Sequence, residues 1–273
     1  MTQNPDVVVV TGAGGMGLAV ARRIGSGRTT ILADASPETL DRAVEALQAE
    51  GYAVTGQITD VSDAASVTKL AEAAAAEGRL AAVVHTAGVS AATAPVDTIM
   101  KVDLLGTALV IDAFEPVATR GMSLVCVASV AGHVAQLTPD QEAALATTPA
   151  ADLLDLDVVR AAEGGAPVGA YILAKRANHV RVQAAAMDYN RRGARINSIS
   201  PGVISTPMSH AEQQSEAGHH MMVSLQACGI GRPGTPGELA ALAAFLTGPE
   251  SLYLTGTDVL LDGGQAAWMR WHR

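Results

Sequence analysis

Tyr171 and Lys175 form the residue pair in this sequence best suited to acid–base chemistry. They stand four residues apart after two small residues, Gly169 and Ala170, and on a helix this spacing places both side chains on one face. A free tyrosine phenol has a pKa too high for it to act as a base at neutral pH, but a neighbouring ammonium favours the phenolate. The pair is therefore a candidate for proton transfer. The same spacing also occurs where a half-buried ring lies beside a solvated cation, so the function needs support from other segments.

A glycine-rich turn follows the first apolar run of the chain, residues 7–11. The turn consists of Gly12, Ala13, Gly14, Gly15, Met16 and Gly17. Its glycines fit the pattern G-x-G-x-x-G between a strand and a helix, where missing Cβ atoms let the backbone approach a pyrophosphate closely. No Lys-Ser/Thr pair follows, which excludes a nucleoside triphosphatase P-loop. Enzymes that use S-adenosylmethionine have similar turns, so a methyltransferase stays open at this point.

Asp34 follows the second predicted strand, 22 residues after Gly12 (34 − 12 = 22). An acid at this place can bind the ribose hydroxyls of an adenosine. Its charge would repel a 2′-phosphate by about 4 kcal/mol at close range and intermediate dielectric, and by less in solvent, which favours NAD over NADP. No basic residue follows Asp34 immediately. The alternative is an aspartate that only caps the loop.

Strand-like and helix-like segments alternate along the chain. Apolar runs without polar alternation suit strands that are covered on both faces, as in a parallel sheet. Seven such strands with helical crossovers predict one doubly wound α/β domain of the Rossmann type over residues 1–273, with helices on both faces. Ser36 and Pro37 predict the start of a helix that ends near Glu50. The predicted strands are Val7–Thr11, Thr29–Ala33, Ala53–Gln57, Ala82–Thr86, Ser123–Ala128, Arg195–Ile199 and Asp258–Leu261.

Two segments depart from this alternation. Residues 133–168 are a predicted helical insertion, because the fifth strand lies unusually far from the helix that begins near Gly169. Within it, Thr138 and Gln141 predict a capping box, and a second helix is expected over residues 149–162. We expect the insertion at the C-terminal edge of the sheet, over the ligand site, or else at the surface or in a subunit contact. Residues 204–230, which contain methionines and glycines, are expected to form a substrate cover.

Composition excludes several other classes of function. The 18 Lys+Arg and 27 Asp+Glu residues give a net charge of −9, so nucleic acid is not an expected partner. The longest stretch without charge, residues 121–139, contains polar residues and is not expected to span a membrane. The cysteines, Cys126 and Cys228, and the absence of a signal-peptide pattern predict a cytoplasmic protein. His219 and His220 have no acidic or cysteine partner at ligand spacing, so no metal site is predicted.

Seven segments, in this order along nearly the whole chain, resemble the short-chain dehydrogenase/reductase family. They are the glycine turn; Asp60-Val61; Thr86-Ala87-Gly88; Ser129 in Ala-Ser-Val-Ala-Gly; Tyr171 with Lys175; Asn197 through Pro201-Gly202; and Asp262-Gly263-Gly264. The resemblance implies that Ser129 hydrogen-bonds the substrate oxygen, that Tyr171 transfers the proton, and that Lys175 holds the nicotinamide ribose while tuning the tyrosine. It further implies that the cofactor is bordered by Asp60 and Val61 at the adenine, by Thr86, Ala87 and Gly88, and by Pro201, Gly202, Val203 and Thr206 at the nicotinamide.

The sequence departs from the family pattern in three places. The glycine turn is one residue shorter than the usual T-G-x-x-x-G-x-G, and His85 stands where the family commonly has asparagine. Asp103 replaces the asparagine that completes the catalytic tetrad. An ionised aspartate cannot donate the side-chain hydrogen bond of an asparagine. We expect Asp103 to act through its backbone carbonyl, by holding a proton-relay water.

The leading hypothesis is an NAD-dependent oxidoreductase that interconverts a secondary alcohol and a ketone, with Tyr171 as general acid/base. A sensor that holds NAD without turning it over is the alternative, which Asp103 and the insertion motivate. The insertion is similar to that of some hydroxysteroid dehydrogenases, which implies a bulky apolar substrate such as a steroid or another cyclic ketone. In many relatives the tyrosine helix forms a subunit interface, so a homodimer or homotetramer is expected. The closing segment with Trp268 and Trp271 is either a subunit contact or a tail.

Overall fold

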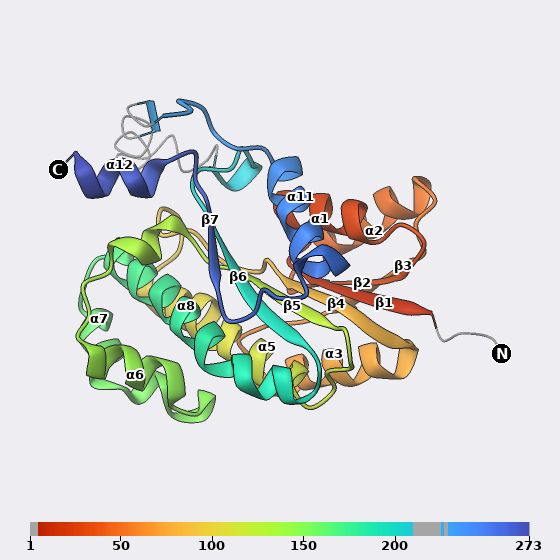
Figure 1. The fold of residues 1–273 in the computed structure, drawn as a ribbon, viewed down its shortest axis with the longest axis horizontal. Helices are drawn as coiled ribbons and strands as arrows, with labels where there is room; N and C mark the ends of the chain where they lie inside the picture. The colour runs from red at the N-terminus through yellow and green to blue at the C-terminus, as the bar shows by residue number, and fades with distance from the viewer. Residues whose placement is uncertain (1–4, 210–224, 227–228, 273) are drawn as a thin grey trace.

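Seven parallel strands form a single sheet, which confirms the predicted fold class (Figure 1). The computed structural model describes residues 5–209, 225–226 and 229–272. The strand order is β3-β2-β1-β4-β5-β6-β7, so the direction of winding reverses between β1 and β4. The strands are β1 (Asp6–Thr11), β2 (Thr29–Asp34), β3 (Val54–Ile58), β4 (Arg79–His85), β5 (Ser123–Val127), β6 (Arg195–Pro201) and β7 (Asp258–Leu261).

The four consecutive valines of β1 explain why the strands appear in the sequence as unbroken apolar runs. Val7 and Val9 belong to the core on one side of the sheet, whereas Val8 and Val10 belong to the core on the other side. All four are fully buried. Since successive side chains of a strand point to opposite faces, a strand covered on both sides needs an apolar residue at every position.

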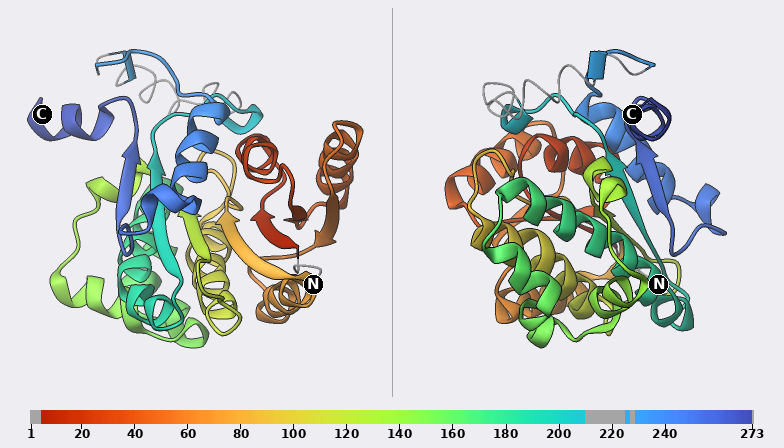
Figure 2. Two further views of the ribbon diagram at one scale, coloured as in Figure 1. Left: turned by 45° about the vertical axis from the view of Figure 1, so that its right-hand side comes forward. Right: turned by 90° about the vertical axis from the view of Figure 1, so that its left-hand side faces the viewer.

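Helices cover both faces of the sheet. Helices α1, α2 and α11 pack on one face, and α3, α5 and α8 pack on the other (Figures 1 and 2). Their ranges are α1 (Gly15–Ile24), α2 (Pro37–Ala49), α3 (Ala64–Glu77), α5 (Gly106–Phe114), α8 (Pro167–Arg191) and α11 (Pro236–Thr247). The shorter elements are α4 (Val96–Ile99), the π-helix η1 (Met100–Leu105), the 3₁₀-helices η2 (Val130–Val134), η3 (Ala150–Asp155) and η4 (Pro249–Ser251), and α6 (Pro139–Thr147), α7 (Asp157–Glu163) and α12 (Gln265–Trp271).

The predicted helix starts of α2 and α6 are confirmed by their caps. The Ser36 hydroxyl accepts a hydrogen bond from the backbone N–H of Thr39 at the start of α2. At the start of α6, Thr138 and Gln141 form the predicted capping box, with hydrogen bonds of 3.2 and 2.9 Å in the two directions.

The prediction of one continuous second helix in the insertion is wrong. The segment is divided into η3 and α7, because Leu156 between them has an extended backbone (φ −60°, ψ 137°). Leu153 and Val159 are both fully buried in one apolar cluster. Positions six residues apart would lie about 120° apart around an unbroken α-helix. The break therefore allows both side chains to reach the same cluster.

Of the two positions predicted for the insertion, α6 does not take the one over the ligand site. Instead of lying at the C-terminal edge of the sheet, α6 packs along α8, through an ion pair of 2.6 Å between Glu142 and Arg176. Further along α8, the guanidinium of Arg181 donates to the backbone carbonyls of Leu145 and Thr148 at 3.0 and 2.9 Å. The first part of the insertion is thus a second layer over the helix that carries Tyr171.

Much of the predicted substrate cover, including His219, His220 and Cys228, lies outside the described residues. Of its described part, Leu225 is buried against Val203 and contacts Trp268 of α12. Trp271, near the end of the same helix, is 73% exposed.

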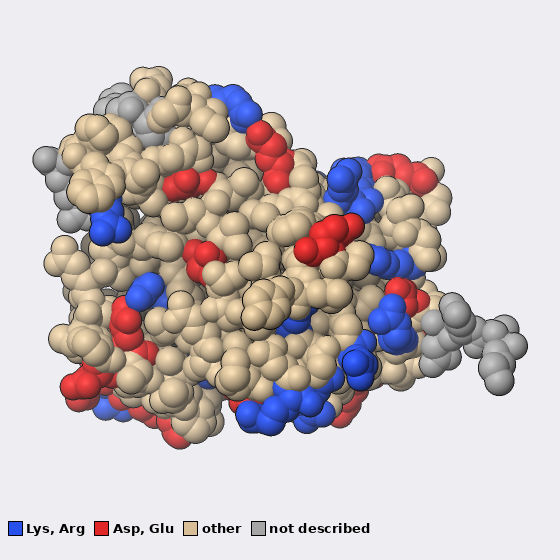
Figure 3. Space-filling model, in the orientation of Figure 1, with Lys and Arg blue, Asp and Glu red and all other residues tan. Residues whose placement is uncertain are grey.

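The surface carries charges of both signs. On the face shown in Figure 3, Lys and Arg side chains stand among Asp and Glu side chains around a centre with few charges. Within residues 5–209, 225–226 and 229–272, no helix combines the length and apolarity needed to cross a bilayer. Cys126 is a free thiol in the core, and burial raises its pKa to about 12, so its chemistry is suppressed.

Candidate active site

A cavity of about 710 Å³ lies over the carboxyl ends of β1, β2, β3 and β4. Its walls are the loops that follow these strands, which is where ligands bind in doubly wound sheets. It is lined by most of the predicted cofactor residues, namely Gly12, Gly14, Gly15, Met16, Gly17, Asp34, Asp60, Val61, Thr86, Ala87, Gly88 and Thr206. Pro201, Gly202 and Val203 do not line it; they lie at and just beyond the end of β6, where Gly202 donates its N–H to the Leu261 carbonyl.

The glycine turn has the backbone geometry that a phosphate needs. Gly12 adopts a positive φ of 86°, and a Cβ on Gly17 would collide with the Gly12 carbonyl oxygen, so side chains are excluded at both positions. Helix α1 begins at Gly15, and no side chain caps its N-terminus. Its first N–H groups and the positive end of its dipole therefore remain for an anion in the cavity.

Asp34 lies at the end of β2, in the cavity wall. One carboxylate oxygen accepts the N–H of Ala13 at 2.7 Å, and the other accepts the N–H of Ser36 at 2.8 Å. The side chain thus fastens the glycine turn to the second strand, as the loop-capping alternative predicts. It also lines the cavity, so binding of a ribose by the remaining lone pairs stays a prediction.

Arg42 is a cavity residue that sequence reasoning missed. It lies on α2 and lines the same cavity as Asp34, together with Thr39. The available signal was helical spacing, because Thr39 and Arg42 are three residues apart near the start of the helix that follows the acid. The cavity therefore contains one acidic and one basic side chain on the β2–α2 side.

Lys175 and Tyr171 lie together on α8, as predicted. The ammonium nitrogen of Lys175 is 5.3 Å from the centroid of the Tyr171 ring. The Lys175 side chain is only 6% exposed, whereas Tyr171 is half-buried. A largely desolvated cation therefore lies close to a phenol that solvent can reach, which is the arrangement expected to favour a phenolate.

The sequence did not predict that Lys175 forms a buried ion pair with Asp103. Its Nζ lies 3.0 Å from Asp103 Oδ1, and the Asp103 side chain is fully buried within η1. The same oxygen accepts the N–H of Val89 at 3.3 Å, while Oδ2 has no hydrogen-bond partner among the described residues. Burial raises the pKa of Asp103, and the charge of Lys175 opposes that rise. Burial also lowers the pKa of Lys175, but Asp103 and Tyr171 act together in the opposite direction and the pKa is raised overall, so the ammonium is retained.

The backbone carbonyl of Asp103 is held by a chain of hydrogen bonds that begins at β1. The Thr107 hydroxyl donates its proton to this carbonyl at 3.0 Å. The same hydroxyl oxygen therefore accepts a hydrogen bond from His85 Nε2–H, 3.2 Å away. His85 Nδ1 then accepts from the Thr11 hydroxyl at 2.7 Å. Burial lowers the pKa of His85 to about 3, and Lys175 acts in the same direction, so the ring is neutral and makes one hydrogen bond of each kind. His85 thereby positions the π-helix that carries Asp103.

The short helix η2, which begins directly after Ser129, packs closely against the tyrosine helix. Ser129 is the N-cap of η2, and its hydroxyl accepts the N–H of Ala131 at 3.1 Å. A Cβ on Gly132 of η2 would lie only 2.8 Å from the carbonyl carbon of Lys175 and 2.6 Å from the His179 ring. Only glycine allows η2 to approach α8 this closely, so the turn after Ser129 is packed directly on the helix of Tyr171 and Lys175.

Comparisons with known proteins agree with this architecture. A family described as short chain dehydrogenase matches residues 6–139, and one described as enoyl-(acyl carrier protein) reductase matches residues 137–266. The chain is 40% identical to the short-chain dehydrogenase/reductase bsc3 of Alternaria brassicicola, over 97% of both chains. It is 31% identical to a meso-2,3-butanediol dehydrogenase of Serratia marcescens, over 96% of this chain and 94% of the relative.

Solved structures agree as well. The crystal structure of levodione reductase is similar with a TM-score of 0.77 and 26% identity, over 97% of this chain and 99% of that one. The two family matches together span the sheet from β1 to β7. The chain belongs to the short-chain dehydrogenase/reductase family of oxidoreductases.

Proposed function

We propose that the chain is an NAD(H)-dependent oxidoreductase that interconverts a secondary alcohol and a ketone, with Tyr171 as general acid/base. The observation that carries the proposal is the buried cation of Lys175 beside the phenol of Tyr171, 5.3 Å from its ring, on the helix packed against the turn of Ser129. An ammonium beside a phenol favours the phenolate, and the ion pair with Asp103 keeps Lys175 in its charged form. A protein that only stored a dinucleotide would have no use for this pair.

In the proposed reaction, Tyr171, Ser129 and Lys175 have distinct tasks. A bound nicotinamide would supply the hydride chemistry, which is acceptance from the alcohol carbon in oxidation and donation to the ketone carbon in reduction. Tyr171 takes the hydroxyl proton during oxidation and gives a proton to the carbonyl oxygen during reduction. The Ser129 hydroxyl holds the same substrate oxygen, and Lys175 stabilises the charge on Tyr171 and holds the nicotinamide ribose.

The cavity fits a dinucleotide at several points. The glycine turn offers uncapped N–H groups at the start of α1, and Asp34 and Asp60 give the adenosine side of the cavity a negative charge. This charge favours NAD. Arg42 lines the same region and would instead attract a 2′-phosphate, so the preference depends on which side chain is nearer to the ribose.

Removing the charge of Asp34 and removing the charge of Arg42 should change the cofactor preference in opposite directions. For Asp34→Asn we expect the ratio of kcat/KM for NADPH to that for NADH to rise about tenfold or more, equal to about 1.4 kcal/mol, because a like-charge repulsion is removed. For Arg42→Ala we expect this ratio to fall. Initial rates with both cofactors measure the effect. Unchanged ratios in both variants would show that another group sets the preference.

We extend the proposal to a bulky apolar substrate. A second cavity, of about 310 Å³, lies between the insertion and the start of α8. It is lined mainly by small and apolar residues, among them Leu137, Val158, Ala170 and Leu173, and two of these directly precede or closely follow Tyr171 in sequence. The test is a panel of secondary alcohols and ketones, from small diols to cyclic ketones, with NADH and NADPH. Turnover should increase toward the apolar compounds; tight NADH binding without any turnover would favour the sensor alternative.

A homodimer or homotetramer in a cytoplasmic setting belongs to the same proposal. The face of α8 that carries Arg176 and Arg181 is covered by α6, so a subunit contact over that face would be made through the insertion. Light scattering at micromolar concentration should report at least a dimer. A monomer would contradict this part of the proposal.

A further inference from the structure

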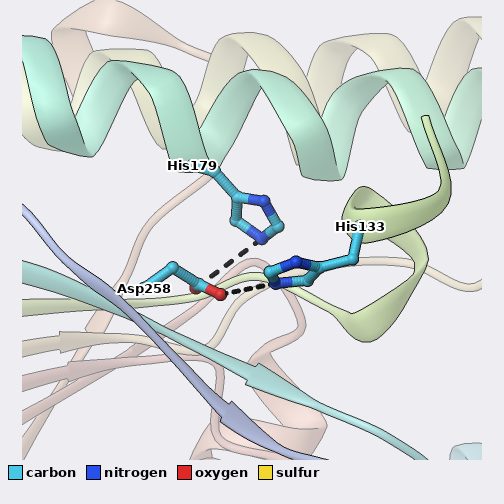
Figure 4. A group of neighbouring side chains, drawn as sticks. All are labelled: His133, His179 and Asp258. Carbon is cyan, nitrogen blue, oxygen red and sulfur yellow. Dashed lines mark hydrogen bonds and ion pairs between the residues drawn. The ribbon is translucent and has the colours of Figure 1, made fainter. Parts of the chain in front are cut away.

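Three side chains that the proposed reaction does not use meet one helical turn beyond Lys175. His133 comes from η2, His179 from α8 and Asp258 from the start of β7, and Figure 4 shows the two rings directed at the carboxylate. One ligand atom from each lies within 4.8 Å of the other two. We propose that these residues bind a late divalent transition metal such as Zn²⁺. Sequence reasoning found no such site, because the ligands come from three distant segments.

The distances between the donor atoms suit a metal of this class. Zinc bonds of about 2.0–2.1 Å in a tetrahedron place neighbouring donors about 3.3 Å apart. Here His133 Nε2 is 2.7 Å from Asp258 Oδ2, and His179 Nε2 is 3.6 Å from Asp258 Oδ1. The two observed values are measured to different oxygens of Asp258 and lie on either side of the required one. The side chains must therefore rotate for one ion to bind all three residues. Two imidazoles and one carboxylate also match the donor preference of Zn²⁺ and leave a position for water.

Two serines of β6 orient the carboxylate. Ser198 and Ser200 place their hydroxyls 2.6 and 2.9 Å from Asp258 Oδ1, which leaves Oδ2 directed at His133. Hydrogen bonds of this kind fix the ligands of metal sites. The nitrogen of His179 that faces the carboxylate, Nε2, lies 2.7 Å from the Ser200 hydroxyl. A metal ion bound to His179 would replace this hydrogen bond, whereas the Ser198 hydroxyl would still hold Asp258 Oδ1.

The charges around the cluster leave Asp258 available to a cation. The two nearest cations on α8, Lys175 and Arg176, are each paired with another carboxylate, at 3.0 Å with Asp103 and at 2.6 Å with Glu142. The site is also reachable. The His133 side chain is 29% exposed, whereas those of Asp258 and His179 are 8% and 1% exposed. Because β7 is the outermost strand of the sheet, an ion can enter past His133 and reach donors that are shielded from water.

A metal at this place would connect the elements that carry the catalytic groups. η2 begins directly after Ser129, and His179 lies one turn after Lys175 on α8. The ion would bind both elements to the edge of the sheet. Its role would be to position Ser129 relative to Tyr171, and not to take part in hydride or proton transfer.

Zinc binding tests the proposal directly. To remove adventitious zinc binding by adjacent histidines elsewhere in the chain, the experiment uses the full chain with His219→Ala and His220→Ala, freed of metal by a chelator. Calorimetric titration with ZnCl₂ should give one ion per chain with a micromolar or lower Kd, and Co²⁺ should give the visible absorption of a tetrahedral nitrogen–oxygen site. Zinc should also raise the thermal unfolding midpoint, because it binds only the folded chain.

Matched variants identify the ligands. His133→Ala, at the exposed end of the cluster, should weaken Zn²⁺ binding at least tenfold and abolish the cobalt spectrum. His272→Ala removes a histidine beyond α12 and should leave both unchanged. Circular dichroism establishes that each variant is folded. No stoichiometric binding at tens of micromolar zinc, or equal affinity in His133→Ala and its parent, would overturn the proposal and leave a hydrogen-bonded cluster only.

Discussion

Replacing Asp103 by leucine should lower the free energy of unfolding by about 3–5 kcal/mol, the usual cost of removing one partner from a buried ion pair. The reason is the burial of Lys175, whose ammonium would keep its desolvation cost but lose the carboxylate 3.0 Å away. Water cannot readily take the place of the lost carboxylate, because the Asp103 side chain is fully buried and Lys175 is 5% exposed. Denaturant unfolding with linear extrapolation measures the change.

Two further variants separate the charge effect from packing. In Asp103→Leu with Lys175→Met, no unpaired charge remains, so much of the lost stability should return. Asp103→Asn keeps an oxygen that can accept a hydrogen bond from Lys175, so it should cost less than leucine. Glu50→Gln, which breaks the exposed pair with Arg22, serves as a surface control. If Asp103→Leu is no more destabilising than this control, the ion pair does not hold the site together.

The sheet was predictable because its strands are buried on both faces. The valines of β1 and the limits of β7, residues 258–261, follow from apolar runs alone. Two strand limits were missed by more than one residue: β4 begins at Arg79, three residues earlier than predicted, and β6 ends at Pro201, two residues later, because pairing with neighbouring strands extends them there. The broken second helix of the insertion depends on the cluster that buries Leu153 and Val159, which no local pattern reveals.

The parts of the site that directly follow a strand were predictable, because the carboxyl ends of parallel strands meet at one edge of the sheet. The glycine turn and Thr86 line the cavity for this reason. The contacts that tune the site were not predictable, because they join distant positions. Asp103 and Lys175 are 72 residues apart, and His85 links Thr11 to Thr107 across two strands and a helix. Asp103 in the place of the family's asparagine indicated that a contact had changed, but only the fold shows that its partner is Lys175.

Replacing Tyr171 by phenylalanine should remove catalysis while it leaves cofactor binding intact. General acid–base groups contribute about 10²–10⁴-fold to a rate, and we expect kcat/KM to fall by that amount, because phenylalanine has no hydroxyl that could accept or donate the proton. The ring and its contact with Lys175 are kept in this variant, so the buried ion pair and the fold should be unaffected. Tyr253→Phe, at a fully exposed tyrosine, is the matched control and should keep the wild-type rate.

The most direct test combines two values from one preparation of Tyr171→Phe: its affinity for NADH, by fluorescence titration, and its turnover of a substrate that the unmodified chain accepts. We predict an NADH affinity within about threefold of the unmodified chain and a turnover at least about a hundredfold lower. Unchanged turnover in the absence of the phenol would contradict the assignment of Tyr171 as the group that transfers the proton.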